Sequence, residues 1–142
     1  MFDSDLREID ARIAESVLHY HREKVPPDAN GENGGDDVLI PPGKTLGILY
    51  NDGIQLPPKG AIGLAYFVPQ FSKFHAEAFH LLHRFKPPHY HTRLVITDTG
   101  KWRCDIDLRG GDGPVCSAAH ENLLIAICMC ILQVADNTTS NT

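Results

Sequence analysis

Between residues 38 and 132 the sequence alternates short apolar runs with turn residues, and this pattern constrains the fold more than any other feature. A run of four to eight apolar residues bounded by Gly, Pro, Asn or Asp is typical of a β-strand. Regular repetition of such runs favours an antiparallel sandwich, jelly roll or barrel. We therefore predict a mainly β domain over residues 38–136, with runs such as VLIPPG, TLGILY, AIGLAYFVP, TRLVIT, RCDIDL and LLIAICMCIL.

Two segments have helical rather than strand spacing. Apolar residues recur every three or four positions within residues 1–24 and again within residues 71–85. This spacing predicts an amphipathic helix at the amino terminus and one helix inserted into the β framework. Residues 25–37 are rich in Pro, Gly, Asn and Asp, which predicts a flexible loop, and residues 137–142 are expected to form a disordered tail.

The charge distribution and the termini exclude several classes of protein. The net charge is −5 and the 13 Lys and Arg residues are spread along the chain, so we expect no nucleic-acid partner. The amino terminus is charged from its third residue and lacks the apolar core of a signal peptide. The longest apolar run, at residues 123–132, is about half of a membrane helix and is interpreted as a buried strand. We predict a soluble intracellular protein of the cytoplasm or nucleus, not secreted, with its four cysteines as thiols.

Two long stretches carry motifs in a familiar order. LIPPGKTLGILYNDGIQLPPKGAIGLAYF at residues 39–67 contains a Pro-Gly turn, an apolar run and a Leu-Pro segment. ITDTGKWRCDIDLRGGDGPVCSAAHENLLIAICMCILQVAD at residues 96–136 contains an Asp-Thr-Gly turn followed by two further apolar runs. In this order and spacing the chain resembles the dUTP pyrophosphatase and dCTP deaminase superfamily. The resemblance implies a distorted jelly roll or β-barrel and a homotrimer with sites between subunits.

The resemblance also implies where a nucleotide and the chemistry would be placed. Asp98 stands at the position of the family's catalytic aspartate, and Asp107 stands where the deaminases carry a general-base glutamate. Ser72 and Lys73 occupy the phosphate-binding motif. The remaining nucleotide contacts would come from Gly100, Lys101 and Trp102.

Several family features are absent from this chain. The phosphate-binding motif lacks its Arg, Lys101 replaces an aromatic residue, and Arg103 replaces a Gly. The carboxyl terminus lacks the Arg- and Gly-rich arm that closes over the triphosphate. The superfamily includes viral descendants that lost catalysis and became protein-binding scaffolds. We therefore predict a catalytically degenerate, oligomeric module that binds a nucleotide or a protein.

Three alternatives remain open. The chain could be an active pyrophosphatase or deaminase, which as a pyrophosphatase would use Mg²⁺, with Asp98 activating water. Asp98 could instead be a turn residue only, because Asp and Thr before Gly stabilise turns through local hydrogen bonds. A third possibility is a cupin-type metal site, since His89 and His91 share a strand face and His120 follows a second short motif.

Overall fold

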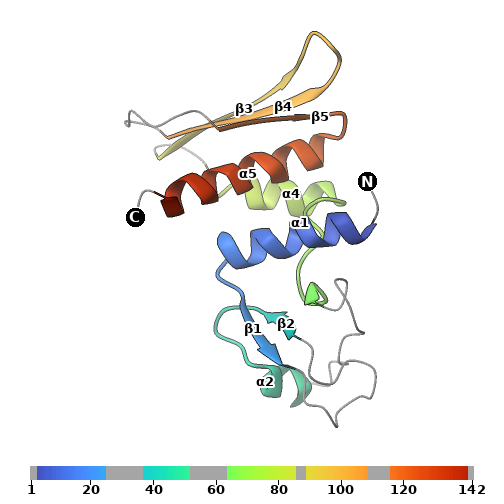
Figure 1. Cartoon of the computed structure of the whole chain (residues 1–142), viewed down its shortest axis with the longest axis vertical. Helices are drawn as coiled ribbons and strands as arrows, with labels where there is room; N and C mark the ends of the chain where they lie inside the picture. Colours follow the sequence, from blue (N-terminus) through green and yellow to red (C-terminus); the bar gives the residue numbers. More distant parts are fainter. Residues whose placement is uncertain (1–2, 25–36, 52–63, 86–88, 109–115, 141–142) are drawn as a thin grey trace. The chain divides into compact units, whose positions relative to one another are not determined.

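The computed structural model describes residues 3–24, 37–51, 64–85, 89–108 and 116–140. The chain divides into two compact units, Met1–Pro69 and Gln70–Thr142 (Figure 1). The division falls inside the segment 38–136 for which a single β domain is predicted. Within the described residues no helix is both long and apolar enough to cross a membrane.

In its described residues the first unit contains helices α1 (Asp3–Ser16) and α2 (Leu46–Asn51) and a two-stranded sheet. Helix α1 is followed by strands β1 (His21–Lys24) and β2 (Asp37–Ile40), which pair antiparallel, and then by helix α2. One apolar cluster joins β2 to α2, made of Val38, Ile40, Leu46 and Leu49 with Phe67 packed against it. The strand predicted at the start of VLIPPG is confirmed.

The amino-terminal helix is confirmed, but its predicted extent is wrong beyond Ser16. The backbone of His19 adopts a φ of 61°, which a continuing right-handed helix does not allow. The amide of Tyr20 donates to the carbonyl of Ala14 and ends the helix. The chain then forms β1, because residues 21–24 find a pairing partner in β2, which is distant in sequence.

The run TLGILY forms helix α2 instead of the predicted strand. Two oxygens cap its amino terminus: the amide of Leu46 donates to the Glu23 carboxylate at 3.1 Å, and the amide of Ile48 donates to the Thr45 hydroxyl at 3.2 Å. Leu46 and Leu49 are three residues apart and both are buried. The capping contact from Glu23 comes from another element, which the local sequence does not reveal.

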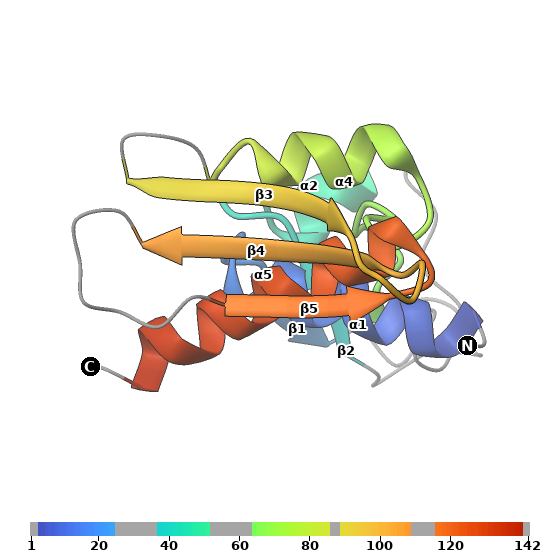
Figure 2. The ribbon, with the colours of Figure 1, turned by 90° about the horizontal axis from the view of Figure 1, so that it is seen from above.

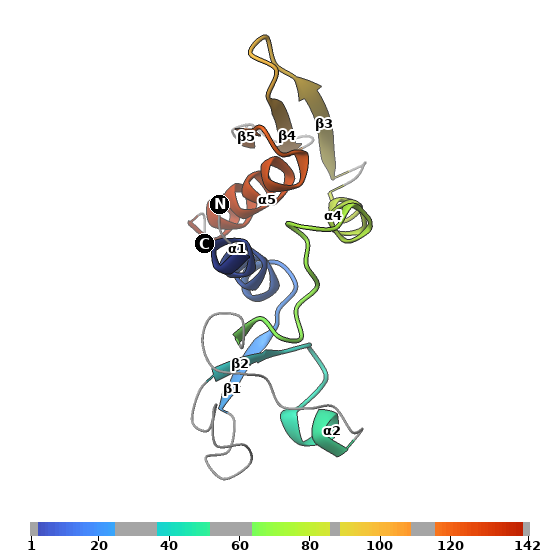
Figure 3. The same cartoon turned by 90° about the vertical axis from the view of Figure 1, so that its right-hand side faces the viewer.

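The second unit is a three-stranded antiparallel sheet with helices on one face. Helix α4 (His75–Leu82) precedes strands β3 (Tyr90–Ile96), β4 (Trp102–Leu108) and β5 (Cys116–His120), and helix α5 (Leu123–Ser140) follows them. The strands lie in the order β3-β4-β5 (Figure 2). Helix α5 packs against β4 and β5 and also contacts α4, and Figure 3 shows both helices on the same side of the sheet.

The predicted fold class is confirmed only in its coarser part. The described residues contain five strands in two antiparallel sheets. These sheets have two and three strands and do not close into a barrel, and helices make up a large share of the structure. The protein is therefore a mixed α and β structure. The inserted helix predicted at residues 71–85 is confirmed in its central part as α4.

The apolar run at residues 123–132 is helical, so its interpretation as a buried strand is wrong. Periodicity could not separate the two structures, because nearly every side chain of the run is buried. Met129, Gln133 and Asp136 are exposed and recur every three or four residues, so they mark the exposed side of the helix. Helix α5 also extends to Ser140, into the segment predicted as a disordered tail from residue 137.

Three of the four buried cysteines lie between the sheet and α5. The thiol of Cys130 on α5 donates to the backbone carbonyl of Cys116 on β5 at 3.2 Å. A hydrogen bond with the thiol of Cys104 on β4, together with burial, raises the pKa of Cys130. Burial also raises the pKa of Cys116, and the Asn137 amide that donates to its sulfur at 3.1 Å opposes this. These raised pKa values keep both thiols protonated and poorly nucleophilic.

We expect all four cysteines to be protected from thiol reagents in the folded protein. Labelling by dithionitrobenzoate should be slower by roughly 100-fold or more than in denaturant, which corresponds to a local opening free energy of about 2.8 kcal/mol. All four side chains are buried, and none is in a disulfide. Rapid native labelling of Cys104, Cys116 or Cys130, located by mass spectrometry, would contradict the packing of α5 on the sheet.

Candidate functional site

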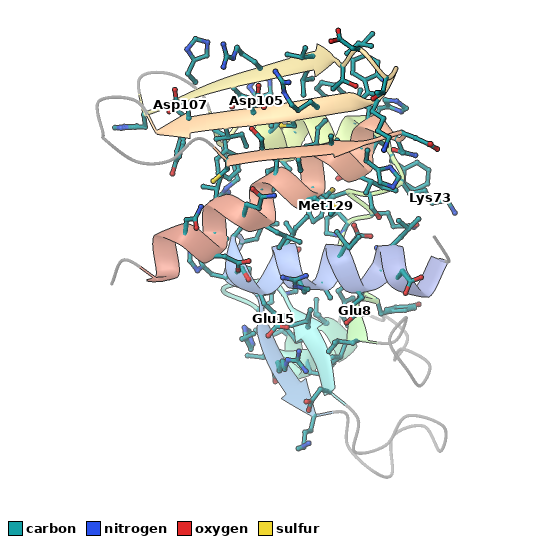
Figure 4. All side chains as sticks on the ribbon, turned by 45° about the horizontal axis from the view of Figure 1, so that its top comes forward. Glu8, Glu15, Lys73, Asp105, Asp107 and Met129 are labelled. Atoms are coloured by element: carbon teal, nitrogen blue, oxygen red, sulfur yellow. The ribbon has the colours of Figure 1, made fainter. Side chains whose placement is uncertain are left out.

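The sheet of the second unit has one face that α4 and α5 do not cover. Strand alternation and register place eight residues on this open face: His91, Arg93, Val95, Arg103, Asp105, Asp107, Ser117 and Ala119. Figure 4 labels two of them, Asp105 and Asp107, on β4. Most of these residues are polar or charged, so the open face is a candidate surface for binding.

Asp105 is the centre of a polar network on the open face. Its side chain is only 5% exposed, and it accepts hydrogen bonds from Arg103 Nε at 3.0 Å and from Ser117 Oγ at 2.7 Å. Arg93 on β3 lies farther away, with its Nη2 at 3.9 Å from the carboxylate. The carboxylate is thus held by neighbours on three strands. Because so little of the Asp105 carboxylate is exposed to a ligand, its role in this arrangement is to hold the neighbouring Arg and Ser side chains in place.

Asp98 lies at the exposed tip of the hairpin between β3 and β4. The turn is closed by a hydrogen bond from the amide of Thr97 to the carbonyl of Lys101 at 2.8 Å. Gly100 has a φ of +82°, a conformation that glycine adopts without strain. The Thr97 hydroxyl accepts from the amide of Lys101 at 3.1 Å. These contacts show that the segment around Asp98 is a hairpin turn.

The two predicted catalytic carboxylates lie at opposite ends of β4. Asp98 precedes the strand, whereas Asp107 lies near its end, opposite His91 on β3. Five residues of extended chain between Trp102 and Asp107 span about 17 Å, so the two carboxylates do not converge on one small ligand. The structure does not bring Asp98 and Asp107 together.

The predicted nucleotide-binding residues are divided between two turns. Ser72 and Lys73 lie in the turn before α4, where Ser72 is buried and Lys73 is exposed (Figure 4). Gly100 and Lys101 lie in the β3–β4 hairpin, and Trp102 begins β4. Trp102 is half-buried and faces His120 of β5 in the strand register.

The structure also separates the predicted histidine ligands. His91 lies at the start of β3 and His120 at the end of β5, beside opposite ends of β4. The Nδ1 atom of His120 accepts the amide of Asn122 at 2.9 Å, so this ring organises the turn before α5. His89 is exposed just before β3. No three His, Cys, Asp or Glu side chains in the described part of the chain lie where they could share a metal ion.

The turn after His120 leads to a helix cap that can be tested. The Asn122 side-chain oxygen accepts the amides of Leu124 at 2.9 Å and Ile125 at 3.3 Å. We expect Asn122→Ala to lower the free energy of unfolding by about 1 kcal/mol, because both amides lose their acceptor. Asn122→Asp should retain the stability, and Glu121→Ala at the exposed neighbouring position is the control. Urea unfolding followed by circular dichroism measures all three.

A groove lies between α4 and β3 in the second unit. Its volume is about 410 Å³, and its walls come from two elements that the sequence separates by a loop. The residues that line it are Phe79, Leu82, His83, Phe85, His91, Thr92 and Leu94. We call this site the α4–β3 groove. Its walls are mainly apolar and aromatic, with imidazoles at the rim, as is usual for ligand and peptide sites.

The α4–β3 groove follows the edge of the sheet. Among the described strands β3 pairs with β4 alone, so it is an edge strand. Successive residues of a strand point to opposite faces. His91 and Thr92 are adjacent, so their side chains point to opposite faces of the sheet, and yet both line the groove. The groove therefore extends from one face of β3 around the edge of the strand. The Thr92 hydroxyl donates to the carbonyl of Phe85 at 2.8 Å, which fixes the end of the α4 segment against β3.

The sequence around the groove differs in charge from the chain as a whole. Between Lys73 and Arg93 the sequence holds four Lys or Arg residues and five of the eight His, with Glu77 as the one acidic residue. The chain as a whole carries a net charge of −5. Of these Lys and Arg residues only Arg93 lies on β3 and none lies on α4, whereas Lys73 and Arg84 lie just before and just after α4.

Comparison with known proteins gave no match. No family model matches the chain, and no curated protein and no solved structure matches it.

Proposed function

We propose that this protein is a binding module and that its α4–β3 groove receives an extended segment of a partner protein. The observation that supports this proposal most strongly is a groove in which an edge strand lies beside an apolar helix face. An unpaired strand edge offers backbone donors and acceptors to a second strand. An apolar wall beside it offers pockets for the side chains of that strand.

The groove has the two contributions that such binding needs. Phe79, Leu82 and Leu94 supply apolar contact area on one side of the strand edge. Among the strands that the structure describes, β3 (Tyr90–Ile96) pairs only with β4, so its other edge is where a further strand could pair. Backbone pairing supplies affinity that depends little on sequence, and the side-chain contacts supply specificity. The groove walls are fixed by the contact between Thr92 and Phe85 in the free protein, which reduces the entropy lost on binding.

Nucleotide binding is a second candidate function. It is supported by the motif order that resembles the dUTP pyrophosphatase and dCTP deaminase superfamily, and by the Phe79 and Phe85 rings next to the imidazoles of His83 and His91. Aromatic rings can stack on a base, and nearby cations can hold phosphate. This second proposal includes what the resemblance implies, namely a fold related to the jelly roll and assembly into a homotrimer. Analytical ultracentrifugation of the full chain tests whether a trimer forms.

A selection experiment tests the leading proposal. The full chain is used to select from a display library of randomised heptapeptides, and the affinities of selected peptides are measured by fluorescence polarisation. Phe79→Lys should weaken binding by at least roughly tenfold, because an aromatic contact in the groove is lost and a charge is introduced. Phe74→Lys is the matched control, since Phe74 is also an exposed aromatic residue but does not line the groove.

The outcomes separate the two candidate functions. Selected peptides whose affinity falls with Phe79→Lys and stays unchanged with Phe74→Lys support peptide binding in the groove. Equal effects of both variants, or no selected peptide, would overturn it. Thermal stabilisation by dUTP or dCTP with Mg²⁺ would favour nucleotide binding instead. Release of pyrophosphate or ammonia that Asp98→Asn abolishes would show an active enzyme.

A further inference from the structure

We infer that the segment bound in the α4–β3 groove has an acidic residue where it passes Arg93, with apolar residues on either side of it. This inference rests on the proposed function, because it concerns the chemistry of the segment that the groove receives. It follows from the different character of the two sides of β3. One side faces the apolar wall of the groove, and the other side carries positive charge on the open face.

The alternation of β3 determines which side chains a bound strand would meet. Thr92 and Leu94 point toward the helices, whereas His91 and Arg93 belong to the open face. A strand added at this edge has the same alternation. Residues opposite Leu94 therefore point into the groove, and their neighbours point to the open face beside Arg93. Directly opposite side chains on paired strands have Cβ atoms about 5 Å apart, close enough for opposite charges to attract.

Arg93 is well placed for a carboxylate on the bound strand. Its side chain is 61% exposed, and its Nη2 atom lies 3.9 Å from the Asp105 carboxylate. Asp105 already accepts shorter hydrogen bonds from Arg103 and Ser117. Arg93 can therefore turn toward a second carboxylate without leaving Asp105 unsatisfied. Asp107 also lies near this end of the open face, opposite His91, so we expect the contact at Arg93.

The apolar positions follow from the opposite wall. Phe79 and Leu82 of α4 face Leu94 of β3 across the groove. A valine or leucine on the bound strand can fill this space, whereas a charged side chain would lose its hydration there. A second copy of β3 is a poorer occupant, because strand pairing would bring the Arg93 side chains of two copies near each other.

Two labelled heptapeptides test the inference directly. In one probe valine or leucine alternates with glutamate, and in the other the same residues alternate with lysine; both have blocked ends. The glutamate probe should bind the full chain roughly tenfold more tightly than the lysine probe in fluorescence polarisation. Arg93→Glu should reverse this order. Lys101→Glu makes the same change of charge in the β3–β4 turn, outside the groove, and should leave the order unchanged.

A second measurement shows whether the probe adds to the sheet edge. Amide hydrogen exchange of Tyr90–Ile96 should slow when the glutamate probe is bound. A probe with N-methylated backbone amides should lose this protection and bind at least roughly tenfold more weakly. Unchanged exchange in β3, or equal binding of the N-methylated probe, would overturn strand addition.

Failure of this inference is distinguishable from failure of the proposed function. If both probes bind equally, protect β3 and lose affinity with Phe79→Lys, the groove binds peptides without preferring acidic residues, and this inference is wrong. If neither probe binds and the display library also yields no peptide, the proposed function itself is wrong. A dimer of the free protein that the probes dissociate would show a second copy as the occupant.

Discussion

Replacing Arg7 with methionine should lower the free energy of unfolding of the first unit by about 3–5 kcal/mol, the range for breaking a buried ion pair. Arg7 Nη1 lies 2.7 Å from an Asp10 carboxylate oxygen, and the Asp10 side chain is fully buried. The same guanidinium donates to the backbone carbonyls of Ala65 and, at 2.8 Å, Val68. The substitution therefore removes the positive charge beside the buried Asp10 carboxylate. It also removes the donor that links α1 to the turn at Ala65 and Val68.

Arg12→Met on the same helix is the matched control for this prediction. The Arg12 side chain is exposed, and an exposed substitution of this kind usually changes stability by less than about 0.5 kcal/mol. Urea unfolding followed by circular dichroism measures both variants in the full chain. Because the chain has two compact units, the transition of the first unit must be fitted separately. Equal small effects of Arg7→Met and Arg12→Met would contradict the buried contact.

Ile127→Ala in α5 should lower the free energy of unfolding of the second unit by about 2–5 kcal/mol. The Ile127 side chain is fully buried in the described structure, so its truncation removes apolar contacts and leaves a cavity. Met129→Ala is the control on the same helix, since 39% of the Met129 side chain is exposed. We expect its cost to stay below about 1 kcal/mol, because much less apolar area leaves contact with protein.

This pair of variants also tests the helical structure of the run. Residues 127 and 129 are two positions apart, which would place them on one face of a strand but about 200° apart around a helix. Thermal or urea unfolding of both variants gives the comparison. A large, similar destabilisation by Ile127→Ala and Met129→Ala would agree with a strand and contradict α5.

The local sequence predicts an element correctly where the spacing of its apolar residues fits only a helix or only a strand. Residues 90–96 and 102–108 have strand-forming side chains on both sides of an Asp-Thr-Gly turn, and they form the hairpin of β3 and β4. The amphipathic helix at the amino terminus and the helix α4 followed from their spacing. The run at residues 123–132 was ambiguous, because a segment apolar on nearly all sides has no period to measure.

The candidate site was less predictable than the elements that form it. The Asp-Thr-Gly sequence predicts a turn, and Asp98 lies in one, whereas its catalytic role stays a prediction. His91 was selected as a metal ligand, and the structure places it on the rim of the α4–β3 groove. The apolar lining of that groove gave no signal of its own, since Phe79 and Leu94 look like ordinary core residues in the sequence.

The sequence by itself determined the antiparallel hairpin of β3 and β4, the turn at Gly100, the two amphipathic helices and the positive charge between Lys73 and Arg93. These features depend on backbone preferences and side-chain spacing within a few residues. Tertiary structure alone decided that residues 21–24 pair with β2, that Arg7 reaches the carbonyls of a turn about 60 residues away, and that α4 lies beside the edge of β3. The physical reason is that pairing, burial and grooves depend on partners distant in the chain, and these partners come together only when the chain folds.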